Sequence, residues 1–98
     1  MVVTMLEARI NPDKAGELRH EYEKLGDPPP IIVESFLLNT PDNRIWRLVT
    51  VFRSREDLED MRESMRAADQ APPGVRVFQA VGVEPTLTIF DVAAHLGR

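Results

Sequence analysis

The sequence predicts a single small α+β domain in which strands and helices follow in the order β-α-β-β-α-β. Three observations predict it: β-rich apolar segments, two amphipathic helical segments between them, and a spacing of 43 residues that relates the two halves. A chain of 98 residues suits one domain, assigned here to residues 1–98. Its 43% hydrophobic and 29% charged residues are typical of a folded globular protein.

The first half begins with a strand over residues 2–10, where apolar residues are frequent and valines come first. Asn11 and Pro12 then predict a helix start, because asparagine caps free backbone N–H groups and proline fits the first helical position. The helix has apolar residues spaced by three or four positions, at Ala15, Leu18, Tyr22 and Leu25. Gly26 and the prolines at 28–30 end it.

The second half begins with strands over residues 31–40 and 45–53, which form a hairpin around a turn at 41–43. Ser54 is the expected N-cap of a second helix. This helix repeats the apolar spacing at Leu58, Met61, Met65 and Ala68. After the stop at 71–74 we expect a fourth strand over 75–83 and a short fifth strand over 86–92, followed by a tail.

The two halves match at an offset of 43 residues. Asn11 and Ser54 are related by it, and so are Leu18 and Met61, and the paired prolines at 29–30 and 72–73. The match has two readings, a true duplication or the similarity that the shared topology imposes on any such chain. Either reading predicts a ferredoxin-like fold with an antiparallel sheet.

The predicted strands are too apolar for a sheet with one solvated face. Residues of both faces of strand 45–53 are largely apolar, whereas an exposed antiparallel sheet normally alternates apolar and polar side chains. Two helices cover only one face, so we expect a second copy of the chain to cover the other. The chain is thus predicted to be a homodimer with face-to-face sheets, in which the segment 86–98 could cross to the partner.

Composition excludes several classes of function. The net charge of -4 gives no field that attracts nucleic acid or an anionic membrane, so we expect neither partner. The chain has no cysteine, which excludes disulfides and thiolate catalysis. No signal peptide or membrane span is apparent, and we expect a cytoplasmic protein. Histidine occurs at His20 and His95, and no cluster has metal-ligand spacing, so no metal is expected.

Several residues are candidates for a pocket between sheet and helices. Trp46 either lines the pocket or fills the core, and Tyr22 either donates a hydrogen bond into it or is a half-buried core residue. Met61 and Met65 either fill gaps or border a ligand. The remaining candidates for its lining are apolar residues of the predicted strands and first helix: Leu18, Phe36, Leu48, Phe52 and Phe78. Arg47 and Arg53 alternate with apolar neighbours and favour interface ion pairs over ligand binding.

The whole-chain organisation resembles the antibiotic biosynthesis monooxygenase (ABM) domain family of the dimeric α+β barrel superfamily. The most recognisable segment is the strand-to-helix stretch at residues 51–58, VFRSREDL. The resemblance implies a small homodimer with a pocket in each subunit. It also implies oxidation of aromatic polyketides or quinols without metal or flavin, and in some relatives haem degradation. The second helix carries no histidine or tryptophan where active relatives usually have one, which argues against haem degradation.

Active relatives use an asparagine, a tryptophan and a histidine or tyrosine in the pocket. The resemblance therefore assigns catalytic roles to Trp46, Tyr22 and Asn39, with Asn43 as the alternative amide. Three functions follow as hypotheses. The first is a cofactor-free monooxygenase acting on an aromatic or quinol-like small molecule. The second is a non-catalytic, ligand-binding or regulatory homodimer, and the third is a subunit that only mediates assembly, which would have no cavity.

Overall fold

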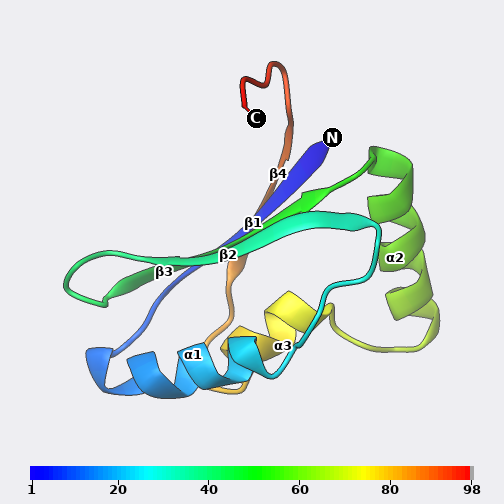
Figure 1. The fold of residues 1–98 in the computed structure, drawn as a ribbon. Helices are drawn as coiled ribbons and strands as arrows, with labels where there is room; N and C mark the ends of the chain where they lie inside the picture. The colour runs from blue at the N-terminus through cyan, green and yellow to red at the C-terminus, as the bar shows by residue number, and fades with distance from the viewer. Residues whose placement is uncertain (98) are drawn as a thin grey trace.

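The computed structural model describes residues 1–97, which form an antiparallel sheet with helices on one face (Figure 1). The elements are β1 (Val2–Arg9), the 3-10 turn η1 (Pro12–Lys14), α1 (Ala15–Glu23), β2 (Ile32–Asn39), β3 (Ile45–Phe52), α2 (Arg55–Ala67), α3 (Pro73–Gln79) and β4 (Thr86–Asp91). The strand order within this sheet is β2-β3-β1-β4, with every neighbouring pair antiparallel. This order confirms the ferredoxin-like α+β fold.

The predicted helix starts and stops are largely confirmed. The Asn11 side chain accepts a hydrogen bond from the Asp13 N–H, and η1 leads into α1. Ser54 caps α2 by accepting from the Asp57 N–H at 3.1 Å. Gly26, just after α1, has a φ of +71°, the left-handed conformation that glycine adopts without strain.

The predicted fourth strand over 75–83 is wrong, because residues 73–79 form the helix α3. A short apolar run does not distinguish a strand from a buried helical turn, and Pro73 at the helix start fixes φ in the helical range. Val77, Phe78 and Val81 all turn toward the core, at a spacing that suits a helix. The fourth strand of the sheet is instead β4, the segment predicted as a fifth strand. It pairs with β1 of its own chain. The predicted crossing of the segment 86–98 to a partner subunit stays a prediction.

The helices cover the sheet unevenly. Figure 1 shows α1 and α3 side by side under one end of the sheet, while α2 stands at the other end. The larger core cluster joins the sheet to α1 and α3 and contains Trp46, Leu18 and Phe78. A separate, smaller cluster joins the sheet to α2 and consists of Val2, Phe52 and Leu58. The core is therefore divided into two parts, with the middle of the sheet between them.

The opposite face of the sheet carries no helix, and we call it the outer face. Its apolar side chains are only partly covered, with Phe36, Leu38 and Phe90 between 42% and 47% exposed. Glu7 and Arg47 are register partners in β1 and β3 and form an ion pair on it. The predicted apolar second face is thus present in the described residues. No helix within them has the length and apolar character that a membrane crossing requires.

Candidate functional site

A cavity of about 640 Å³ lies between the sheet and the helices, at the place where the core is divided. One wall is the start of α3 and the link that precedes it, and another is α2 with Met61 and Met65. The end of α1 and the proline-rich segment that follows it form a further side. This volume is in the range of cavities that hold small organic molecules.

A row of hydroxyl groups crosses the floor of the cavity. Ser35, Thr50 and Thr4 lie opposite one another on β2, β3 and β1, and all three line the cavity. We call these residues the hydroxyl row. On one side of it the sheet presents Leu6 and Leu48, both buried in the larger core cluster. On the other side it presents Val2 and Phe52 of the smaller cluster. The floor is thus polar along this row and apolar on both sides of it, where Leu6, Leu48 and Phe52 also line the cavity.

Tyr22 connects α1 to this floor. Its hydroxyl donates a hydrogen bond of 2.9 Å to Ser35 Oγ, and both residues line the cavity. Tyr22 is placed by the apolar stripe of α1, which packs its ring against the larger core cluster. A serine hydroxyl that accepts one hydrogen bond still has its own proton to donate, so the pair can present a polarised donor to a bound molecule.

The start of α3 approaches the sheet closely at Gly74. A Cβ atom at this position would lie 3.0 Å from Cδ1 of Leu6, so a larger residue would push the leucine or the helix away. Because Gly74 also lines the cavity, the glycine sets how narrow the cavity is at this end.

Charged side chains surround the mouth of the cavity. Arg62 and Arg76 come from α2 and α3, and Lys24, Glu23 and Asp27 come from the end of α1 and the segment after it. Lys24 is paired with Glu21 at 3.1 Å, and Arg62 lies 3.9 Å from Glu59. The mouth therefore carries both signs of charge and does not by itself select an anion or a cation.

The structure places Trp46 away from the cavity lining. Its side chain is 1% exposed and belongs to the larger core cluster. The indole Nε1 donates to the carbonyl oxygen of Asn43 at 2.8 Å, which ties the ring to the β2–β3 turn. Of the two readings left open by the sequence, the position agrees with core filling.

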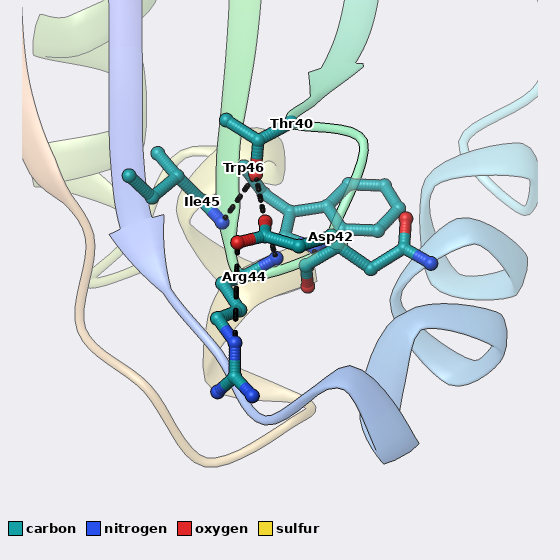
Figure 2. Close-up of polar contacts among 6 residues, drawn as sticks. Thr40, Asp42, Arg44, Ile45 and Trp46 are labelled. Carbon is teal, nitrogen blue, oxygen red and sulfur yellow. Dashed lines mark hydrogen bonds and ion pairs between the residues drawn. The ribbon is translucent and has the colours of Figure 1, made fainter.

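The β2–β3 turn that holds this tryptophan is stabilised by its own polar contacts, shown in Figure 2. Asp42 accepts hydrogen bonds from the Thr40 hydroxyl at 2.6 Å and from the Arg44 N–H at 3.1 Å. These donors lower the pKa of Asp42, with the Thr40 hydroxyl contributing most. Asn39 lies at the same end of the hairpin, where its side-chain amide donates to Asn43 Oδ1 at 2.6 Å.

The predicted site residues are therefore divided between four regions. Around the cavity the structure brings together Tyr22, Leu48, Phe52, Met61 and Met65. In the core or on the outer face lie Leu18, Phe78, Trp46 and Phe36. Asn39 is exposed at the hairpin end. No group of histidine and acidic side chains that could hold a metal lies within residues 1–97.

Sequence reasoning missed the hydroxyl row. Threonine is common in strands, so Thr4 and Thr50 gave no signal individually. A signal was present in the alternate residues of strand 45–53, where Thr50 interrupts the apolar face formed by Trp46, Leu48 and Phe52. Only the register of three strands shows that this interruption continues across the sheet.

Comparison with solved structures extends the observations on the fold. The heme-degrader MhuD from Mycobacterium tuberculosis, solved with two hemes bound in its active site, superposes with a TM-score of 0.71 at 18% identity over 99% of this chain and 100% of that one. A crystal structure of an antibiotic biosynthesis monooxygenase superposes at 0.65 and 13% identity, over 96% and 100% of the two chains. A candidate monooxygenase of the same kind from Nitrosomonas europaea gives 0.68 and 15%, over 96% and 100%.

The chain has the antibiotic biosynthesis monooxygenase fold. These superpositions cover nearly the whole length of each chain, so they compare complete domains of similar size. No protein-family model matches the sequence, and no curated protein matches it either. At identities below one fifth, the likeness to the ABM proteins establishes the fold alone. The chemistry has to be argued from the residues of the site.

Proposed function

We propose that the protein is a monooxygenase that uses O₂ to oxidise an aromatic, quinol-like small molecule without a cofactor. The observation that carries the proposal is the cavity with apolar walls and a hydroxyl floor, in a fold shared with named monooxygenases. An apolar cavity excludes water from a flat ring, and a few fixed donors orient its oxygen atoms.

The chemistry needs no electron donor beyond the substrate. A quinol that loses a proton becomes an electron-rich anion able to reduce O₂. One oxygen atom then forms a bond to the ring carbon, the O–O bond breaks, and the second oxygen leaves as water while the ring ends as a hydroxyquinone. The protein's contribution is to stabilise the anion, which we assign to Ser35 as the hydrogen-bond donor. Tyr22 is the positioning residue that polarises this serine through their 2.9 Å hydrogen bond.

Oxygen consumption with a panel of hydroquinones and anthrones tests the proposal. We expect uptake with at least one of them, and a rate about tenfold lower in Tyr22→Phe, since Ser35, the donor to the developing anion, then loses the hydrogen bond that orients and polarises it. The matched control is Thr88→Val, because Thr88 lies on the outer face, outside the cavity. Absence of uptake with every substrate, or an unchanged rate in Tyr22→Phe, would contradict the proposal.

The second candidate function is ligand binding without turnover. The observation that favours it is that neither histidine lines the cavity: His20 is exposed on α1 and His95 lies in the segment after β4. Histidine is the commonest general base, so its absence from the lining leaves deprotonation to the carboxylates Glu23 and Asp27, which also line the cavity, or to the substrate's own acidity. A bound ligand that causes no oxygen uptake would support this candidate. A subunit serving assembly alone would be expected to fill the cavity.

We also propose that the protein is a homodimer, formed by packing the outer faces of two sheets. The outer face supports this, because its phenylalanines and leucine are nearly half exposed and lie on one continuous surface of the sheet. Apolar surfaces of this kind on soluble proteins mark interaction sites. The Glu7–Arg47 pair in the middle would set the relative orientation of two copies.

A further inference from the structure

The hydroxyl row interrupts the apolar inner face of the sheet, and packing alone does not explain it. Thr4 and Thr50 are direct partners across β1 and β3, with apolar pairs on both sides: Leu6 with Leu48, and Val2 with Phe52. Valine has nearly the shape of threonine and is also favoured in strands, so packing by itself does not require the two directly opposed hydroxyls.

The two threonine hydroxyls are available to a ligand. Neither makes a hydrogen bond to another group of residues 1–97, whereas Ser35 is engaged by Tyr22. Both threonines are half-buried and line the cavity, a place where solvent can satisfy their hydroxyls. A ligand that displaces this solvent has to supply hydrogen-bond acceptors at the same places, because an unsatisfied buried hydroxyl is costly.

The spacing of the two hydroxyls restricts where those acceptors lie on a ring. Directly opposed residues of antiparallel strands have Cα atoms about 4.5–5.5 Å apart, and their side chains project in parallel. Two oxygen atoms para or meta to each other on an aromatic ring are separated by a similar distance. Two ortho oxygen atoms are much closer together and would leave one hydroxyl without a partner.

We propose that Thr4 and Thr50 form a two-point recognition element that selects rings with para or meta oxygen atoms over ortho isomers. In this arrangement each threonine donates to one ring oxygen while Leu6 and Leu48 contact the ring face from one side. The inference rests on the proposed function, since it names the substrate class of the same cavity. It concerns binding, so it is tested separately from turnover.

Calorimetric titration with para-naphthoquinone and ortho-naphthoquinone tests the selection. The two isomers have the same atoms and nearly the same shape, and the absence of cysteine removes the commonest quinone adduct. We expect the wild-type protein to bind the para isomer about tenfold more tightly, which corresponds to one well-made hydrogen bond. Thr50→Val and Thr4→Val should each reduce this preference to near unity, while Thr88→Val should retain it.

The outcomes separate the inference from the proposed function. A para preference that survives in both Thr50→Val and Thr4→Val, or equal binding of the isomers by the wild-type protein, overturns the inference. Far-ultraviolet circular dichroism and urea unfolding of each variant establish that it is folded, and either threonine variant suffices for the comparison. A threonine-dependent para preference without oxygen uptake from any quinol supports the inference and contradicts the monooxygenase.

Discussion

At the scale of single residues, the two aromatic residues with polar groups have different roles. Tyr22 spans the gap between α1 and the sheet, and its hydroxyl reaches the cavity floor. Trp46 is buried in the larger core cluster, and its indole hydrogen bond goes to the hairpin turn. We assign Tyr22 to the site and Trp46 to the framework that holds β3 in place. The catalytic role given to Trp46 by the family resemblance stays a prediction. Comparing a Trp46 variant with the wild-type protein tests it.

Trp46→Phe distinguishes these roles. We expect a loss of about 2–3 kcal/mol in the free energy of unfolding, because the smaller ring leaves a void and the Asn43 carbonyl loses its donor. Urea denaturation measures this loss, and quinone affinity measured on the folded variant should stay within about twofold of wild type. A large fall in affinity with unchanged stability would instead place Trp46 in the site.

At the scale of elements, the residues that begin and end the helices could be predicted from the sequence. The helical conformation of α3 could not. Asn11, Ser54 and Gly26 act locally, through their own side chains or backbone, so their roles could be deduced from neighbouring residues. The run at 75–83 is apolar without a decisive period, and its conformation depends on what it packs against. The structural match between the two halves also ends at this segment. Pro30 precedes the strand β2, whereas Pro73, its counterpart 43 residues later, begins the helix α3.

The cavity was only partly predictable for the same reason. Met61, Met65 and Tyr22 could be assigned to it because the helical period fixes which side of α1 and α2 faces the sheet. Phe36 was predicted to line the pocket but lies on the outer face. The sequence does not decide its face, because both alternating sets of residues in β2 are rich in apolar side chains. A register irregularity between Ile32 and Glu34 further changes which residues of β2 share a face.

The start of α2 gives a prediction about pH. Arg53 donates a hydrogen bond to Asp57 at 2.8 Å, which is the main reason that the pKa of Asp57 is lowered. A lowered carboxyl pKa in the folded state adds stability above the unfolded pKa of about 4, and this stability is lost as the pH falls through the folded value.

Arg53→Met should therefore destabilise the protein at neutral pH and have little effect in strong acid. Chemical denaturation of both proteins at a series of pH values between about 2 and 7 measures the difference. We expect the difference in unfolding free energy to shrink as the pH decreases. A difference that is constant with pH would mean that Arg53 acts only through packing of its aliphatic part.

At the scale of the whole molecule, the two faces of one sheet have separate tasks. The inner face holds the cavity between two core clusters, and the outer face presents apolar side chains without a cover in the described residues. The dimer proposed for the outer face leaves the cavities of both copies open, because they lie on the far sides of the two sheets.

Phe36→Asp tests the dimer without touching the cavity. Phe36 is 42% exposed on the outer face, so a carboxylate there is solvated in a monomer but would be buried between two sheets. Light scattering at micromolar concentration should report a dimer for the wild-type protein and a monomer for the variant. A wild-type protein that is a stable monomer under these conditions contradicts the proposed dimer.

The central claim is that the cavity between the sheet and α2 is where an aromatic molecule binds. The four methionines are suitably distributed to test it: Met61 and Met65 line the cavity, whereas Met1 and Met5 do not. Methyl NMR of the methionine-labelled protein, titrated with para-naphthoquinone, observes all four sites at once. We predict that the Met61 and Met65 signals shift while those of Met1 and Met5 stay in place. Shifts confined to Met5 on the outer face, or no shift at any methionine, would contradict the account.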